Sequence, residues 1–310
     1  MAPNFFNPKN SLNLFGLREN FDFISNLYLK NRLPKVLMLT GNKGSGKATL
    51  VSHFLHSIFD KENYDIKNLL SRSNSSFSSQ FLNNIFSNII YLSGSDFKSV
   101  KVEDIRILKK GILKSTISNG DRFIVFDDIE QFNQNSLNAL LKIIEEPSKK
   151  NYFFLINNKS KPLLETIKSR AVEVKIILNE EQRLHIIHKL IDYFKIELVL
   201  DPNSSQLSPG NFVIFNNICK EYNIFPSNDF MKNLTLLVNL YKKNKDSIFI
   251  NIIFFLADCY FKHLKKQNLL ENEKIFEIKN FIFENLDNFV LYNINQNSLL
   301  NTIGEKLNYE

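Results

Sequence analysis

The stretch Val36-Leu-Met-Leu-Thr-Gly41-Asn-Lys-Gly-Ser-Gly46-Lys47-Ala48-Thr49 decides the fold of this chain. Its first five residues form an apolar run typical of a buried strand, and a helical pattern follows its last residues. A strand, a glycine-rich turn and a helix in this order are typical of a phosphate loop. In such a loop backbone N–H groups and the helix N-terminus attract phosphate oxygens. The stretch therefore predicts a nucleotide-binding α/β domain.

Most of the residues that such a site needs are present in the loop. Lys47 would reach the outer phosphates, but Ala48 stands where a Ser or Thr hydroxyl usually binds Mg²⁺. We therefore expect a degenerate site, with ATP and Mg²⁺ as candidate ligands and the metal held less well. The candidate nucleotide-binding residues of the loop are Gly41, Gly44, Gly46, Lys47 and Thr49.

The rest of the chain alternates apolar runs with helical patterns up to about residue 178, which predicts a parallel sheet with helical crossovers. Beyond that point the strand signal disappears, and we expect helices only. The Ser- and Asn-rich segment 68–80 is predicted to be a loop. Strands are predicted at 36–40, 89–92, 122–127, 152–156 and 172–176, and helices at 17–31, 50–58, 103–112 and 136–146.

Polar residues follow two of the predicted strands, and an arginine precedes a third. Asp127 is placed to hold Mg²⁺, and Asp128 stands where active ATPases commonly have a longer Glu that orients the attacking water. Asn157 could reach a γ-phosphate, although an Asn-rich turn explains it equally well. Arg170 could act on a nucleotide of a neighbouring subunit, but from the residues alone a surface Arg at a helix end is favoured.

Composition sets broader limits. The 310 residues carry a formal net charge of +7, which permits an anionic partner without demonstrating one. The two cysteines lie far apart, so we expect neither a disulfide framework nor zinc. The longest apolar run, 248–257, is too short to span a bilayer, and no secretory signal is recognisable. We expect a soluble cytoplasmic protein that does not contact membranes.

Taken together, several motifs show a family resemblance. The most specific is Asn138-Ala-Leu-Leu-Lys-Ile-Ile-Glu-Glu-Pro147 followed by Ser169-Arg170, and Ser208-Pro209-Gly210 matches a later turn. With the phosphate loop and Phe126-Asp127, they make the chain resemble the clamp-loader branch of the AAA+ ATPases over about residues 10–215.

The resemblance implies a RecA-like AAA+ P-loop domain over 1–178, a small helical lid over 179–224 and an all-helical collar domain over 225–310. It also implies a hetero-oligomer with motor ATPase and delta subunits, which loads a sliding clamp on primed DNA. In such a complex Arg170 would be the catalytic residue in trans, an arginine finger directed at the neighbouring ATPase. The resemblance therefore favours this role over that of a surface Arg at a helix end.

Departures from the family pattern predict which kind of subunit this is. Ala48, the short Asp128, and Asn211 in place of a phosphate-sensing Arg weaken three elements of a working ATPase. We therefore expect a stator that has no ATPase activity of its own within a DNA-directed DNA polymerase holoenzyme. An active motor ATPase of the same branch is the main alternative, and another AAA+ machine is a third.

Overall fold

The structure is a computed structural model that describes residues 7–72, 75–94, 105, 120–203, 205–226, 229–266 and 272–308. It divides into two compact units. The first consists of residues 1–196 and 207–214, and the second of residues 197–206 and 215–310. Each unit is described here by itself, and the three-part division implied by the resemblance stays a prediction.

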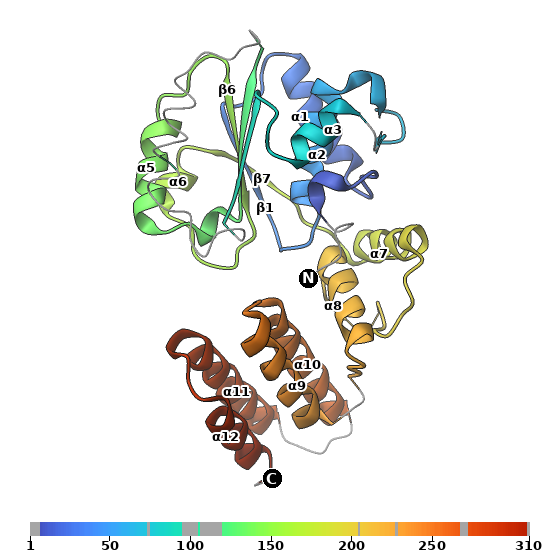
Figure 1. Cartoon of the computed structure of the whole chain (residues 1–310), viewed down its shortest axis with the longest axis vertical. Helices are drawn as coiled ribbons and strands as arrows, with labels where there is room; N and C mark the ends of the chain where they lie inside the picture. The colour runs from blue at the N-terminus through green and yellow to red at the C-terminus, as the bar shows by residue number, and fades with distance from the viewer. Residues whose placement is uncertain are drawn as a thin grey trace. The chain divides into compact units, whose positions relative to one another are not determined.

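A five-stranded parallel sheet forms the centre of the first unit (Figure 1). Its strand order is β4-β5-β6-β1-β7, and Leu37 pairs with both Phe154 of β6 and Val172 of β7. The parallel α/β class predicted from the sequence is confirmed, as are all five predicted strands. The strands are β1 (Val36–Thr40), β4 (Ile89–Ser93), β5 (Arg122–Asp127), β6 (Asn151–Asn157) and β7 (Val172–Lys175).

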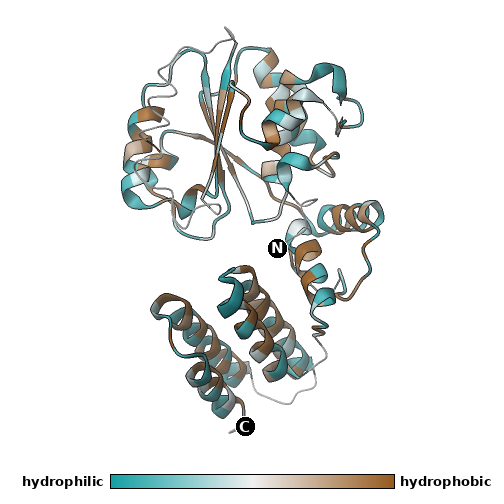
Figure 2. Cartoon of the chain, viewed as in Figure 1, coloured by the Kyte–Doolittle hydropathy of each residue, from teal (hydrophilic) through white to brown (hydrophobic). Residues whose placement is uncertain are grey.

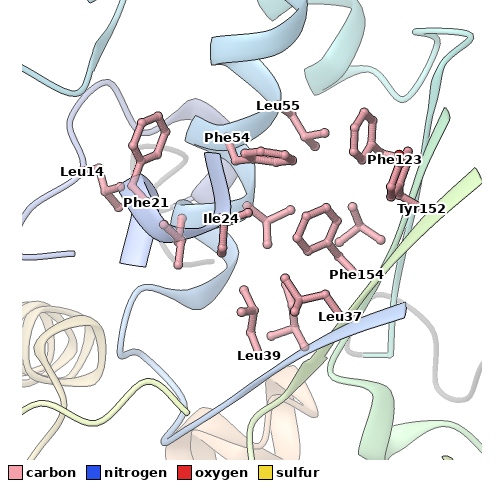
Figure 3. Close-up of a cluster of buried hydrophobic side chains, with 14 of the residues drawn as sticks. Leu14, Phe21, Ile24, Leu37, Leu39, Phe54, Leu55, Phe123, Tyr152 and Phe154 are labelled. Carbon is pink, nitrogen blue, oxygen red and sulfur yellow. The ribbon is translucent and has the colours of Figure 1, made fainter. Parts of the chain in front are cut away.

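Helices cover both faces of this sheet, which explains why its central strands are continuous apolar runs rather than alternating ones. On one face α1 (Arg18–Leu29), α2 (Lys47–Phe59) and α3 (Ser76–Leu82) pack on alternate strand residues such as Leu37 and Phe123. Figure 3 shows this cluster, in which Phe54 of α2 lies among strand side chains. Full burial of one such side chain contributes about 1.5–3 kcal/mol.

The opposite face of the sheet is covered by α5 (Gln134–Ile144) and the short α6 (Glu165–Lys168) (Figure 1). Leu140 and Ile167 are fully buried in its apolar cluster, together with Ile124 and Phe126 of β5. Figure 2 shows hydrophobic colour both along the strands and on the helices. Of the helix predicted at 103–112 the structure describes only Ile105, which is buried in the same cluster, so the rest of that prediction lies outside the described residues.

The Ser-rich segment holds regular structure, and the predicted loop over 68–80 is wrong. Leu70–Ser71 is strand β3, paired with β2 (Tyr64–Asp65), and α3 begins at Ser76. The Ser75 hydroxyl caps α3 by accepting a hydrogen bond from the Ser78 amide at 2.9 Å. Phe77 and Phe81, four residues apart, are buried on one helix face. In this segment Ser75 therefore serves as a helix cap.

All described elements after β7 are helical, as the sequence predicts. In the first unit α7 (Glu180–Phe194) begins with a capping box between Asn179 and Gln182, and α8 begins at the Pro209-Gly210 turn. The second unit packs apolar faces such as that of Leu237 and Ile253 into a helical core. The remaining helices are α8 (Pro209–Glu221), α9 (Phe230–Asn244), α10 (Ile248–Lys266), α11 (Asn272–Tyr292) and α12 (Gln296–Asn308).

Two histidines on α2 are buried beneath α3 and the β2–β3 hairpin. His53 Nδ1 lies 3.0 Å from the Tyr64 hydroxyl, and His56 Nδ1 lies 3.1 Å from the Ser71 hydroxyl. Burial lowers the pKa of His53 to about 3 and that of His56 to about 4, so both rings are neutral at pH 7. Protonating either ring would place a charge inside an apolar cluster.

Acid should therefore destabilise the first unit already at pH values well above those at which most carboxylates titrate. Below the unfolded pKa of about 6.5 the unfolded histidines bind protons that the folded ones do not, so stability falls as pH falls. From pH 7 to pH 5 each histidine costs about 2 kcal/mol. Asp127, whose pKa burial raises to about 6, offsets about 1.4 kcal/mol. We expect a net loss of about 2–3 kcal/mol in urea unfolding.

His53→Phe should reduce the loss between pH 7 and pH 5 to about 0.5–1 kcal/mol, because one of the two buried protonation sites is gone while the offset from Asp127 remains. The matched control is His188→Phe on the exposed surface of α7, which should leave the dependence as it is. A wild-type unfolding free energy that is equal at pH 7 and pH 5 would contradict the prediction.

Candidate functional site

The phosphate loop joins β1 to α2, as predicted. Gly46 ends the loop with φ +89° and gives way directly to Lys47, the first residue of α2. The Lys47 ammonium is buried and donates to the loop's own carbonyls, to Gly41 O at 2.8 Å and Asn42 O at 2.7 Å. Burial lowers the pKa of Lys47 to about 8, against the opposing effect of Asp127, Glu130 and Asp128. The loop thus binds the lysine that a nucleotide phosphate would need.

A second segment closes on the tip of this loop. The Gly210 amide donates to Gly44 O at 2.8 Å, and the Ser208 hydroxyl donates to Lys43 O. Gly44 has φ +81°, and a Cβ built on it would lie 2.5 Å from the Ser208 hydroxyl. The Ser208-Pro209-Gly210 turn, noted in the sequence for its family pattern, therefore touches the phosphate loop through the Ser208 hydroxyl and the Gly210 amide.

The predicted acids lie beside the loop, at the carboxyl end of β5. Asp127 accepts hydrogen bonds from the Tyr91 hydroxyl at 2.6 Å and from the Asp128 amide at 2.9 Å. Asp128 has φ +50° and accepts from the Asn158 side-chain amide at 2.6 Å, and its carboxylate lies 3.6 Å from Lys43 Nζ. Both carboxylates thus already have protein partners where a hydrated Mg²⁺ would bind.

Asn157 lies at the carboxyl end of β6 as predicted, but its side chain serves its own turn. The side-chain oxygen of Asn157 accepts a hydrogen bond from the Lys159 amide at 3.0 Å. The neighbouring Asn158 donates its side-chain amide to Asp128. Sequence reasoning missed Glu130, a buried carboxylate that accepts from the Ser160 hydroxyl at 2.8 Å and the Asn158 amide at 3.1 Å. Its position two residues after Asp128 was the only signal in the sequence.

A cavity of about 260 Å³ lies against the loop. Lys47, Thr49 and Asp127 line its polar side, and Ala48 also borders it. The lining beyond the loop is largely apolar: Leu14, Phe15, Ile186, Leu190, Phe194, Pro209, Val213 and Ile214. An apolar wall next to a phosphate loop suits a nucleoside. The donor set fits the metal less well, because Ala48 brings no hydroxyl and its side chain packs on the apolar cluster of α1 and α2.

Among the residues that the structure describes, no group of three or more His, Cys, Asp or Glu side chains is close enough together to hold a metal ion. The described helices likewise include none that is both long and apolar enough to cross a membrane.

Arg170 is not part of this constellation. It lies two residues before β7, and β7 runs parallel to β1 with Val172 beside Leu37 and Lys175 beside Thr40. Because Gly41 follows Thr40, the phosphate loop leaves the carboxyl edge of the sheet while Arg170 precedes the amino edge. The Arg170 guanidinium pairs with Glu145 at 2.7 Å and donates to Thr166 O at 2.9 Å. The structure therefore separates Arg170 from the chain's own nucleotide site.

Comparison with known proteins places these features in a family. The model of the family described as "DNA polymerase III, delta subunit" matches residues 17–179, more than half of the chain. The chain belongs to this family. Several relatives are DNA polymerase III subunit delta prime; they confirm the clamp-loader resemblance of the motifs and indicate a subunit of the delta prime type.

Two similar proteins, each DNA polymerase III subunit delta prime from a subspecies of Buchnera aphidicola, illustrate the range of the match. The one from the Acyrthosiphon pisum subspecies is 32% identical over 82 residues, 26% of this chain and 25% of the relative. The one from the Baizongia pistaciae subspecies is 27% identical over 218 residues, 64% of this chain and 63% of the relative. The chain thus spans between a quarter and just under two thirds of these relatives' own length.

Among solved structures, a gamma subunit-related protein of DNA polymerase III from Thermotoga maritima is 15% identical, with a TM-score of 0.44. The superposition covers 91% of this chain and 96% of that protein.

Gly44→Ala should break the contact between the phosphate loop and the 208–210 turn. The new Cβ meets Ser208, and an alanine at φ +81° is strained, so we expect a stability loss of about 1–3 kcal/mol in urea unfolding. Gly120→Ala is the control, because its nearest neighbour would be 3.4 Å away, and it should stay within about 0.5 kcal/mol of wild type. Equal stability of both variants would show that the contact is not formed.

Proposed function

We propose that the chain is a clamp-loader subunit of DNA polymerase III and acts as its stator. Membership in the DNA polymerase III subunit family and the delta prime relatives support the assignment to this complex. Its partners would be the motor ATPase and delta subunits, with the sliding clamp and primed DNA reached through the complex. A cytoplasmic location follows from this role.

The observation that carries the stator role is the closed phosphate loop. Lys47 is bound by Gly41 O and Asn42 O, so phosphate would have to displace these carbonyls. The turn at Gly210 holds Gly44 by a backbone hydrogen bond. Phosphoryl transfer depends on positioned lysine and metal ligands, and here both are compromised. ATP binding is thus a weaker expectation than in a motor subunit.

The alternative is an active motor ATPase, and the retained Lys47 and Asp127 favour it. The two roles make opposite predictions for the purified chain. A stator should hydrolyse ATP far below the rate of about 1 s⁻¹ that marks the low end of working enzymes. A motor should turn over steadily, and Lys47→Ala should abolish that turnover. Measured turnover of about 1 s⁻¹ that is lost in the Lys47→Ala protein would overturn the stator proposal.

The second part of the proposal assigns Arg170 to a neighbouring site as an arginine finger. Its place at the amino edge of the sheet, away from the chain's own phosphate loop, supports action in trans. A planar guanidinium can pair with two phosphate oxygens at once as charge develops on them. The second unit would provide assembly contacts, and the exposed Phe276, Leu291 and Tyr292 on α11 support that role.

Arg170→Ala should leave folding and assembly nearly intact but slow clamp loading by a reconstituted complex. Fingers in other systems contribute about 10³–10⁵ to the rate. Bulk ATPase should fall less than this, because only one of several sites loses its finger, whereas loading should fall further. Arg170→Lys should restore little of the lost loading rate, since the point charge of an ammonium cannot pair with two phosphate oxygens as the planar guanidinium does. The assays are clamp loading and DNA- and clamp-stimulated ATPase, and unchanged values in both would refute the finger role.

A further inference from the structure

Glu145 is the one acidic side chain that the described residues place in ion-pair contact with Arg170. Its Oε1 lies 2.7 Å from Arg170 Nη2. Glu145 and Arg170 lie 25 residues apart in the chain. Their pair joins the Asn138–Pro147 segment to Ser169-Arg170. Arg170 Nη1 is held at the same time by Thr166 O at 2.9 Å. The guanidinium is therefore fixed from two elements, α5 and α6.

Both elements are anchored in the same apolar cluster. Leu140 and Ile144 bury the face of α5 on the sheet, and Ile167 does so for α6. Glu145 directly follows Ile144, and its amide still bonds Leu141 O. Figure 1 shows α5 and α6 together on one side of the sheet. The backbone on each side of the ion pair is thus held by packing rather than by the pair itself.

Helix stability does not explain Glu145. It caps the C-terminus of α5, where the helix dipole makes a carboxylate unfavourable. Nor does the ion pair explain it, because the Arg170 and Glu145 side chains are 35% and 45% exposed, and exposed pairs contribute little to stability. The contact with Arg170 is thus the feature of this carboxylate that points to a role.

The contacts leave Arg170 able to bind a further anion. A guanidinium has five N–H donors. Glu145, Thr166 O and the Ser169 hydroxyl, the last at a long 3.5 Å, account for at most three of them. At least two donors remain on a side chain that is held in place and partly exposed. Phosphate oxygens of a neighbouring nucleotide are ligands that suit such a half-occupied fork.

We propose that Glu145 is a positioning residue that pre-orients the Arg170 guanidinium for the nucleotide of the neighbouring ATPase subunit. The proposal rests on the finger role proposed above for Arg170. Holding the long side chain in one geometry before assembly removes an ordering cost from the reaction in the neighbouring site. Glu145 would not contact the nucleotide itself.

The test uses the full chain in a complex reconstituted with the motor and delta subunits, with ATP, clamp and primed DNA. Glu145→Ala should lower the loading rate by about 10-fold, since small misplacements of catalytic groups cost up to about 10²-fold. Glu145→Gln keeps an acceptor of the same reach and should retain more activity. The matched control, Glu146→Ala, removes the neighbouring exposed carboxylate and should load like wild type.

Two further readouts separate positioning from structural damage. Glu145→Ala should move the Tm of the chain by no more than about 3 °C, because the pair is exposed. In an Arg170→Ala background, Glu145→Ala should cause no additional loss, since it acts only through Arg170. Stimulated ATPase should lose kcat with little change in the KM for ATP.

The outcomes distinguish the two proposals. If Arg170→Ala slows loading but Glu145→Ala matches wild type and Glu146→Ala, the positioning role is wrong and the finger stands. An additive loss in the double variant also overturns positioning. If Arg170→Ala leaves both the loading rate and the stimulated ATPase unchanged, the finger role is wrong, and so is the positioning role that depends on it.

Discussion

A buried ammonium needs partners, and the partners of Lys47 shape the whole site. Removing a charge from water is costly unless hydrogen bonds and opposite charges replace the water. Here Gly41 O and Asn42 O provide the bonds, and Asp127, Asp128 and Glu130 provide negative charge. The loop is stable because it binds its own lysine, and the feature that makes it stable is the one that would compete with a nucleotide phosphate.

The acids around Lys47 form a second layer of the same arrangement. Asp127 is held by Tyr91, Asp128 by Asn158, and Glu130 fixes the turn after β6 through Ser160 and the Asn158 amide. Residues that act on water or metal in an ATPase here hold neighbouring loops to one another. Such a network of side-chain hydrogen bonds supports the stator role proposed above.

Much of this was predictable from the sequence, for identifiable reasons. The central strands β5, β6 and β1 are buried on both faces, so their apolar runs are unambiguous, and the glycine-rich turn after Val36–Thr40 marks the edge where the site forms. The helix α3 was not predictable in the same way. Its serines are typical of loops, and only the fold shows that Ser75 caps a helix whose Phe77 and Phe81 pack against the buried His56. The pairing of Glu145 with Arg170 was also hidden, because spacing along the chain says nothing about which helix ends meet.

The contact between Gly44 and Gly210 is made of backbone atoms alone, whereas the contact between Glu145 and Arg170 is a partly exposed pair of charges. Dissolved ions screen the second and scarcely affect the first. Ionic strength therefore affects the two contacts differently. Concentrated salt would weaken the pairing of Arg170 with Glu145, while the hydrogen bond between Gly210 and Gly44 would persist.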